Sequence, residues 1–228
     1  MLKTIWGQGV PYGRYCPNQT AGCVITATAQ ILSYYQTIED VSCTYDNSVK
    51  TAHLNWPRIL ADIKDTDGRL YPWMSLSSHE VATLVGYLGN AMEAVYYPSY
   101  ETMAPSSNAI NWMNTYGGLH ATPLKEFDET AIVNAIIENK LVYGRGQEIG
   151  ALSGHAWVYD GYIKAQKGSC TPQYMLHCNW GWDGQRNGYY LSKVFNTYAG
   201  AQFPDNKDED SSRSYYFNNN LEYSIVSK

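Results

Sequence analysis

The sequence predicts an α+β fold, and a change of pattern near residue 140 carries that prediction. Before this point apolar residues recur at helical spacing, most clearly over 23–36, 79–88 and 129–139. After it, short runs of β-branched and aromatic residues alternate with turn residues, which is typical of an antiparallel sheet. Helices followed by strands, rather than alternating with them, indicate the α+β class.

The first expected helix spans 23–36 and is apolar around most of its circumference. Ile25 and Leu32 fall on one face, and a second apolar face adjoins it, so we expect the whole helix to be buried. The residues before it, 4–22, are rich in glycine and proline and should be irregular. Thr20 is the expected N-cap residue.

The remaining elements follow from shorter patterns. Asn187-Gly188 is typical of a tight turn between two antiparallel strands. Residues 205–214 are polar throughout and are expected to form a loop. Further helices are expected at 56–64, 79–88, 106–115 and 129–139, and strands at 141–143, 155–162, 174–179, 188–191 and 221–226.

Composition and charge exclude several classes of protein. Of the 228 residues, 44% are hydrophobic and 16% are charged, which is typical of an ordered globular protein. The length suits one domain or two tightly packed halves with a sizeable core, and we expect a single domain over 1–228. The net charge of −5 offers no basic surface to nucleic acid or to an anionic membrane. No apolar run approaches the roughly eighteen residues of a membrane-spanning helix. We therefore expect no nucleic-acid partner and no membrane span.

The cysteines indicate neither a metal site nor a dense disulfide framework. None of the five forms a CxxC pair or a Cys/His spacing typical of metal ligands, so no metal or cofactor is expected. An odd number leaves at least one free thiol, and if Cys23 is that thiol at most two disulfides can form. The five are Cys16, Cys23, Cys43, Cys170 and Cys178.

Cys23 is the candidate nucleophile. It opens the expected buried helix, where the positive end of the helix dipole lowers the pKa of a thiol and favours the thiolate that attacks carbonyl carbon. His155 heads an expected strand between Gly154 and Gly161, and a histidine about 130 residues after the cysteine is the order and spacing of papain-like enzymes. Taken singly, Cys23 also fits a small buried hydrophobe, and His155 fits a satisfied core or surface histidine.

Three further residues complete a possible catalytic set. A cysteine protease needs an acceptor that orients the imidazole and an aromatic group that shields this hydrogen bond, and Asn179 and Trp180 supply both. The Gln8 amide, upstream of the nucleophile, can donate to an oxyanion together with the backbone N–H of Cys23. Taken alone, Asn179 and Trp180 also fit a packed β-turn, and Gln8 fits an ordinary loop residue.

Together these segments resemble the streptopain family, the papain-like cysteine peptidases of streptococci and Bacteroidetes (family C10). Residues 8–12 are similar to the family's Gln-Gly-x-Pro-Tyr stretch, and 20–32 to its nucleophile helix. Residues 154–162 match the histidine motif, and 179–184 with 187–190 match the Asn-Trp-Gly-Trp signature and the strand after it. The resemblance is specific and runs from residue 6 to about residue 191.

The resemblance implies a role for each residue of the set. Cys23 is the nucleophile, His155 the base and then the acid, and Asn179 the group that orients His155. Trp180 shields the hydrogen bond of the imidazole, and Gln8 donates to the oxyanion.

The resemblance also implies a substrate-contacting loop. The segment at 96–99 is similar to the family's Tyr-Gly-Pro-Ser loop beside the substrate cleft, with tyrosine in place of glycine at 97 or 96. Its aromatic neighbours favour an apolar substrate side chain two residues before the cleaved bond. If Glu101 points into the cleft, a basic side chain would compete there, because a buried carboxylate pairs with arginine. The family's glycine-rich active-site loop near the C-terminus is replaced here by 196–214, which has few glycines. The expected substrate-contacting residues are Tyr97, Pro98, Ser99, Tyr100, Gly154 and Trp157.

The implied fold is papain-like, with a helical half, an antiparallel-sheet half and the active-site cleft between them. The implied protein is a secreted cysteine endopeptidase, made as a zymogen, that works through an acyl-enzyme. Its signal and pro-segment are expected to lie outside this chain. Its partners would be protein or peptide substrates and its own pro-domain or a protein inhibitor. The sequence also leaves two alternative functions open. One is a papain-like cell-wall amidase or other acyl-transfer enzyme, and the other is a binding protein that has lost activity.

Overall fold

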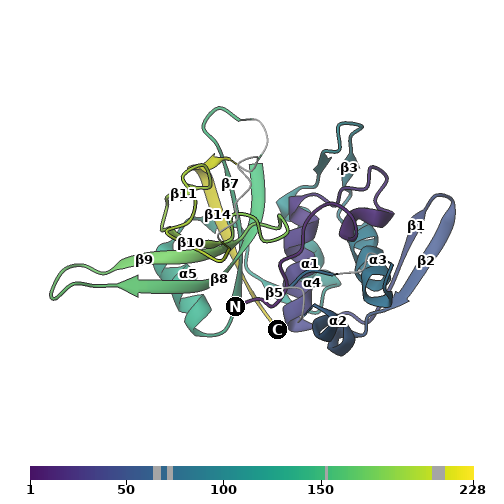
Figure 1. The fold of residues 1–228 in the computed structure, drawn as a ribbon, viewed down its shortest axis with the longest axis horizontal. Helices are drawn as coiled ribbons and strands as arrows, with labels where there is room; N and C mark the ends of the chain where they lie inside the picture. The colour runs from purple at the N-terminus through teal and green to yellow at the C-terminus, as the bar shows by residue number, and fades with distance from the viewer. Residues whose placement is uncertain (64–67, 71–73, 152–153, 207–213) are drawn as a thin grey trace. The chain divides into compact units, whose positions relative to one another are not determined.

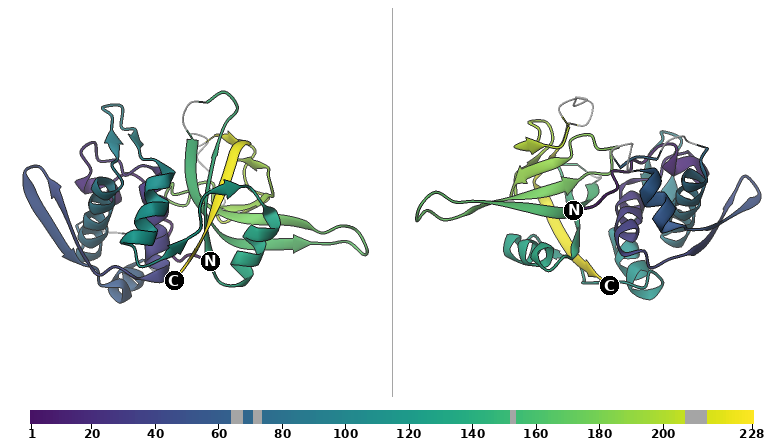
Figure 2. Two further views of the ribbon diagram at one scale, coloured as in Figure 1. Left: turned by 180° about the vertical axis from the view of Figure 1, so that it is seen from behind. Right: turned by 60° about the horizontal axis from the view of Figure 1, so that its bottom comes forward.

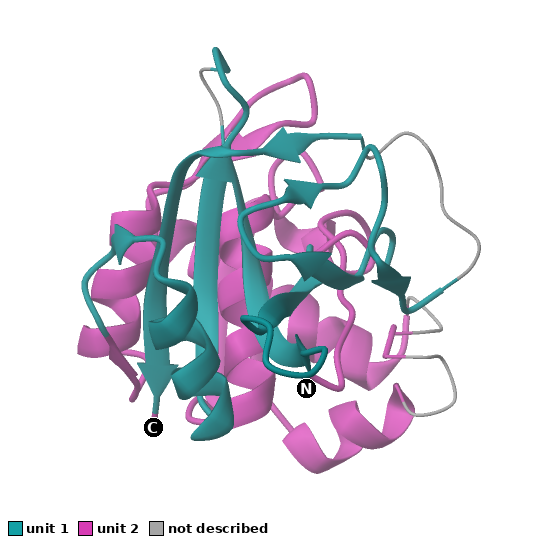
Figure 3. Cartoon of the chain, turned by 90° about the vertical axis from the view of Figure 1, so that its left-hand side faces the viewer, with its two compact units in different colours: residues 1, 122–180, 184–227 teal, residues 2–121, 181–183, 228 magenta. Residues whose placement is uncertain are grey.

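The structure is a computed structural model and describes residues 1–63, 68–70, 74–151, 154–206 and 214–228 (Figure 1). It contains both helices and an antiparallel sheet, which confirms the α+β class. The chain divides into two compact units (Figure 3). Unit 1 comprises residues 1, 122–180 and 184–227, and unit 2 comprises residues 2–121, 181–183 and 228.

Unit 2 is built around α1 (Cys23–Tyr35), which confirms the first expected helix to within one residue. Every residue from Val24 to Ser33 is buried, because α1 packs against α3 (Leu76–Ala91) and α4 (Ser106–Thr115). An all-round apolar helix requires this enclosure. The shorter elements are η1 (Tyr12–Tyr15), α2 (Trp56–Asp62), β3 (Val95–Tyr96), β4 (Thr102–Met103) and β5 (His120–Ala121).

The expectation of helices alone before residue 140 is wrong, because several two-residue strands and one longer β-hairpin precede that point. β1 (Asp40–Tyr45) and β2 (Ser48–His53) form an antiparallel hairpin that packs along α3 (Figure 1). Buried Val41 and Cys43 alternate with exposed neighbours, the pattern of a strand with one covered face. The turn residues Asp46 and Asn47 both have positive φ, which asparagine and aspartate tolerate better than most residues.

Unit 1 contains an antiparallel sheet in the order β12-β10-β9-β8-β7-β14, in which all five expected strands are confirmed. α5 (Glu129–Ile137) packs on β7, β8 and β14 (Figure 2), and the Asp128 side chain caps it by accepting the Ala131 N–H at 3.1 Å. The strand bounds are β6 (Lys125–Glu126), β7 (Leu141–Gln147), β8 (Gly154–Ala165), β9 (Gln173–Asn179), β10 (Gly188–Leu191), β11 (Phe195–Asn196), β12 (Phe203–Pro204), β13 (Tyr216–Phe217) and β14 (Asn219–Ser227).

Two smaller pairings complete unit 1. β6 pairs with β14, and β11 and β13 form a separate two-stranded pair. Most of the polar loop expected at 205–214 lies outside the described residues. Within the part of the chain that is described, no helix is both long enough and apolar enough to cross a membrane.

Candidate active site

Cys23 is the first residue of α1 and is partly buried. The N-cap is Gly22, with φ of 83°, and its carbonyl accepts the N–H of Thr26 at 3.0 Å and the Thr26 hydroxyl at 2.9 Å. A Cβ at Gly22 would lie 2.8 Å from the carbonyl oxygen of Thr102, so this position needs glycine for both its φ and its space. The thiol is thereby placed at the N-terminal end of an enclosed helix, as the sequence predicted.

Thr20 does not cap this helix, so the expectation that it would is wrong. Its N–H donates to Oδ1 of Asn18 at 3.0 Å, and its carbonyl accepts the hydroxyl of Thr102 at 2.6 Å. The chain needs two more residues to turn into α1, and glycine provides the turn without a side-chain cap.

Gln8 lies close in the fold to the residues that precede Cys23. Its carbonyl accepts the N–H of Ala21 at 2.8 Å. Nearby, the N–H of Trp6 donates to Oε1 of the buried Gln30 on α1 at 3.0 Å. These two bonds fasten the segment that contains Gln8 to α1 and to the turn before it. The role of the Gln8 side chain as an oxyanion donor stays a prediction.

His155 is the second residue of β8 and is partly buried. Its Nε2 lies 2.8 Å from the main-chain carbonyl oxygen of Trp180. A carbonyl oxygen only accepts, so Nε2 carries a proton, and in the neutral imidazole Nδ1 therefore keeps the lone pair of a base. The expected acceptor was the side chain of Asn179, whereas this bond goes to the main chain of the next residue. Asn179 is buried at the end of β9, and its orienting role stays a prediction.

Trp180, whose carbonyl accepts from His155, is fixed by two further hydrogen bonds of its own. The N–H of Trp180 donates to Oδ1 of Asn187 at 2.9 Å, and its indole Nε1 donates to the carbonyl of Arg186 at 2.9 Å. Trp180 and Asn187 are both buried. The sequence indicated a tight turn at Asn187-Gly188, but β9 ends at Asn179 and β10 begins at Gly188, so Asn187 instead ends a longer connection between these strands. Nothing in the sequence pattern pointed to its contact with Trp180.

An aromatic cluster surrounds the His155 ring. Phe217 stacks on it with centroids 5.4 Å apart, Trp157 stacks at 6.2 Å, and Trp180 is tilted at 6.1 Å. Trp157 is 0% exposed and packs against the histidine ring. Its contact with substrate stays a prediction. Sequence reasoning missed Phe217, which lies far along the chain outside every motif.

The expected substrate-contacting loop is the turn between β3 and β4. Tyr97, Pro98, Ser99 and Tyr100 are all exposed, Tyr100 at 72%. Gly154, at the start of β8, is exposed too, but a Cβ there would lie 2.7 Å from the carbonyl oxygen of its neighbour on β7. Its glycine therefore serves the close approach of the two strands, and its contact with substrate stays a prediction.

The expected site residues divide between the two units. Unit 2 holds Gln8, Cys23 and the β3–β4 turn, and unit 1 holds His155 with its supporting residues. The Asn-Trp-Gly-Trp segment is itself divided, since 181–183 belong to unit 2. A Cβ at Gly181 would lie 3.0 Å from Cγ2 of Thr26, on the first turn of α1.

None of the five cysteines, all of which lie in the described residues, forms a disulfide, and only two of them are accessible. Burial raises the pKa of Cys16 to about 12 and also raises the pKa of Cys43 and Cys178 above the ordinary value. Cys170 is exposed and Cys23 is partly exposed. Cys170 therefore provides an internal reference thiol for any test of Cys23.

A buried ion cluster lies in unit 1 outside the expected site. His177 on β9 is 2% exposed, with Nδ1 against Asp160 on β8 and Nε2 3.0 Å from Asp205. Both ring nitrogens donate to carboxylates, so the ring is an imidazolium. Burial lowers the pKa of His177, but the hydrogen bonds and charges of the two carboxylates outweigh it and raise the pKa to about 9.

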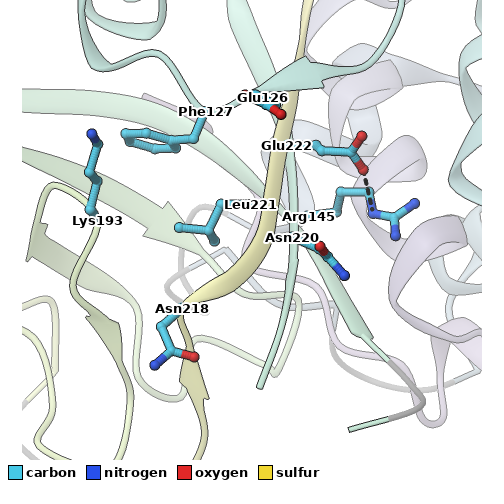
Figure 4. Close-up of a pocket in the computed structure, with 8 residues that line it drawn as sticks. All are labelled: Glu126, Phe127, Arg145, Lys193, Asn218, Asn220, Leu221 and Glu222. Atoms are coloured by element: carbon cyan, nitrogen blue, oxygen red, sulfur yellow. Dashed lines mark ion pairs between the residues drawn. The ribbon is translucent and has the colours of Figure 1, made fainter. Parts of the chain in front are cut away.

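Unit 1 also has a hollow of about 670 Å³ that none of the expected site residues lines (Figure 4). Side chains of both charges face it, and two of them, Arg145 and Glu222, form an ion pair at 3.3 Å. The other lining residues are Glu126, Phe127, Lys193, Asn218, Asn220 and Leu221. Among the described residues, no group of three or more His, Cys, Asp or Glu side chains is arranged to hold a metal ion.

Comparison with known proteins identifies the family. The model of the peptidase C10 family matches residues 6–190. Streptopain of Streptococcus pyogenes serotype M28 (strain MGAS6180) is 26% identical over 231 residues, which cover 85% of this chain and 54% of streptopain. The thiol protease/hemagglutinin PrtT of Porphyromonas gingivalis is 26% identical over 84% of this chain and 23% of its own length. The chain thus spans about half the length of the streptopain relatives that it matches.

A solved structure agrees with these matches. Active wild-type interpain A, a cysteine protease of Prevotella intermedia, is similar with a TM-score of 0.66 and 27% sequence identity. The similarity covers 98% of this chain and 92% of that one, so the α+β fold is that of a cysteine protease over nearly its whole length. Because the family model covers most of the chain, the chain belongs to the peptidase C10 family.

Proposed function

We propose that this chain is a secreted, papain-like cysteine endopeptidase in which Cys23 is the nucleophile and His155 is its base and acid. The observation that carries the proposal is the hydrogen bond from His155 Nε2 to the Trp180 carbonyl, since it selects the tautomer whose Nδ1 can take a proton. Family membership and the order of the motifs support the pairing of His155 with Cys23. Secretion and a zymogen form are included on the strength of the family resemblance.

The reaction proceeds by acyl transfer. The Cys23 thiolate, favoured by the N-terminal end of α1, attacks the scissile carbonyl carbon. The Gln8 amide and the N–H of Cys23 donate to the resulting oxyanion. His155 gives its Nδ1 proton to the leaving amine as the C–N bond breaks, and then takes a proton from the water that hydrolyses the thioester. This sequence needs no metal and no cofactor.

Orientation of the imidazole falls to Asn179 and Trp180. The carbonyl of Trp180 holds Nε2–H, and the buried aromatic rings around it keep water from competing for that bond. Asn179 precedes Trp180 at the end of β9 and acts on the same histidine. Because these residues do not contact the substrate, their loss should lower kcat more than it raises KM.

The substrates are proteins or peptides with an apolar side chain two residues before the cleaved bond. The β3–β4 turn contributes the exposed side chains of Tyr97 and Tyr100 to that subsite. Apolar surface gains about 25 cal/mol per Å² when it is buried, so an aliphatic or small aromatic side chain should be favoured over a charged one by about 1–3 kcal/mol. The protein's own pro-domain or a protein inhibitor would occupy the same subsite.

The test is hydrolysis of casein by the wild-type chain, by Cys23→Ala and by Cys170→Ser. We expect Cys23→Ala to remain folded and to lose activity, and Cys170→Ser to keep it, since Cys170 is exposed and outside the proposed site. Substantial casein hydrolysis by purified Cys23→Ala would contradict the proposal. Hydrolysis of muropeptides but not of casein by the wild-type chain would instead support a cell-wall amidase.

A further inference from the structure

Asn18 joins two parts of unit 2 that are far apart in the sequence. Its Nδ2 lies 2.8 Å from the carbonyl oxygen of Glu101, 3.1 Å from that of Tyr97 and 3.2 Å from the hydroxyl of Thr102. On its other side, Oδ1 accepts the N–H of Thr20 at 3.0 Å. One amide therefore fastens both ends of the β3–β4 turn to the segment that leads into Cys23.

Two further contacts bring the same turn up to the nucleophile. The hydroxyl of Thr102 donates to the carbonyl of Thr20 at 2.6 Å. The carbonyl oxygen of Thr102 lies only 2.8 Å from where a Cβ at Gly22 would be, so the backbones of β4 and Gly22 are in close contact. Gly22 is the residue immediately before Cys23. The position of the turn is thus set relative to the thiol within a single compact unit.

The turn depends on such an anchor because its own strands are very short. β3 and β4 pair over only two residues each, Val95 with Met103 and Tyr96 with Thr102. A hairpin of this size is marginal alone, and Tyr100 at its tip has a φ of 62°, which few residues other than glycine and asparagine adopt readily. The turn nevertheless presents large apolar side chains to solvent, with Tyr97 at 40% and Met103 at 49% exposure.

We propose that Asn18 is a positioning residue that holds the β3–β4 turn beside Cys23 and thereby sets the enzyme's selectivity for the substrate side chain two residues before the cleaved bond. The inference rests on the proposed peptidase function. Asn18 itself does not contact the substrate. It acts by keeping Tyr97 and Tyr100 in one arrangement, so that binding of the substrate side chain does not have to order the turn.

The test variant is Asn18→Asp, which has nearly the same shape and keeps an oxygen to accept the N–H of Thr20. It replaces the donating amide with a charged acceptor facing the carbonyls of Tyr97 and Glu101. Thr102→Val is the second variant, because at nearly constant shape it removes the hydroxyl that donates to the Thr20 carbonyl and accepts from Nδ2 of Asn18. Asn47→Asp is the matched control, since it makes the same charge change on the exposed β1–β2 turn of the same unit.

Two measurements are made on each protein. One is kcat and KM for a pair of peptides that differ only in leucine or lysine two residues before the cleaved bond. The other is the rate at which iodoacetamide alkylates Cys23, followed by peptide mapping, which reports on the nucleophile without any substrate. Thermal melts show whether each variant is folded.

In Asn18→Asp and in Thr102→Val, the ratio of kcat/KM for the leucine peptide to kcat/KM for the lysine peptide should move about tenfold towards one, mainly through changes in KM. A change of this size corresponds to the loss of one or two hydrogen bonds of ordinary strength. The alkylation rate of Cys23 should stay within about twofold of wild type, and Asn47→Asp should change neither quantity. An unchanged ratio in both folded variants overturns the inference. So does a fall in kcat and in alkylation by the same factor, which would show that Asn18 acts on Cys23 itself. A wild-type chain that cleaves neither peptide overturns the proposed function and this inference with it.

Discussion

Replacing His177 with glutamine should remove a pH-dependent part of the stability of unit 1. His177 is an imidazolium between the carboxylates of Asp160 and Asp205, with the ring of Tyr189 4.9 Å away. Glutamine is close to histidine in size and can still hydrogen bond, but it does not titrate. His53, which is exposed and paired with Asp40, offers a matched control in His53→Gln.

The size and sign of the effect follow from the pKa of His177. Burial lowers that pKa, but the two carboxylates raise it from the ordinary 6.5 to about 9. A pKa raised in the folded state stabilises the fold fully below about pH 6.5, and this stabilisation is lost as the pH rises through about 9. Since a tenfold change in proton affinity corresponds to about 1.4 kcal/mol, the contribution is at most about 3 kcal/mol near pH 6 and close to zero near pH 10.

The assay is urea unfolding followed by tryptophan fluorescence from about pH 6 to about pH 10, with a reducing agent and in a Cys23→Ala background that prevents self-digestion. The quantity of interest is the difference in unfolding free energy between the parent and His177→Gln, because groups common to both cancel. This difference should shrink by up to about 3 kcal/mol as the pH rises across that range. His53→Gln should leave the stability nearly unchanged, because an exposed ion pair contributes little.

His177 is not the imidazolium described above if the difference in unfolding free energy between the parent and His177→Gln is the same at both ends of the pH range, or if it grows with pH. Either result would mean that His177 is neutral in the folded protein and that the two carboxylates are held in another way. Asp205→Asn gives an independent check, because it removes one of the two carboxylates and should lower the pKa of His177. The pH at which the stabilisation is lost should fall with it.

Further predictions concern the reaction itself. The pH–rate profile should be a bell, with an acid limb set by formation of the Cys23 thiolate and a basic limb set by loss of the His155 proton; a rate that rises continuously to high pH would contradict it. Asn179→Ala should lower kcat by about one to two orders of magnitude with little change in KM, and a change in KM alone would make Asn179 a binding residue. Gly22→Ala should cost about 1–3 kcal/mol of stability and most of the activity, because φ is 83° there and Thr102 occupies the space; a melt identical to wild type would refute this.

The elements that carry a strong apolar period could be predicted from the sequence, and those that depend on distant contacts could not. α1 was predicted because ten consecutive buried residues leave a clear pattern, and α4 matches its expected bounds. The β1–β2 hairpin was not predicted, although Val41 and Cys43 alternate with exposed residues. Two buried side chains in β1 are too few to give a recognisable strand pattern. β3 and β4 are too short to show any period.

The candidate site shows the same division. Cys23 and His155 lie in motifs, so residue type and spacing were enough to predict both as candidate catalytic residues. The group that accepts the hydrogen bond from His155 Nε2 is a main-chain carbonyl. Every residue has such a carbonyl, so the sequence cannot indicate which one is used. Phe217 stacks on the histidine from a segment with no motif, and the contacts of Asn18 join residues 79 to 84 positions apart. Such contacts exist only once the chain has folded.

The most direct test of the account is the selective alkylation of Cys23. A limiting amount of iodoacetamide is added near pH 6, and intact mass, peptide mapping and casein hydrolysis are followed on one sample. The account predicts a single adduct on Cys23, loss of activity in step with it, and labelling at least about tenfold slower in His155→Ala, because the imidazolium stabilises the thiolate. Labelling of the exposed Cys170 before Cys23, or activity that survives full modification of Cys23, would contradict it.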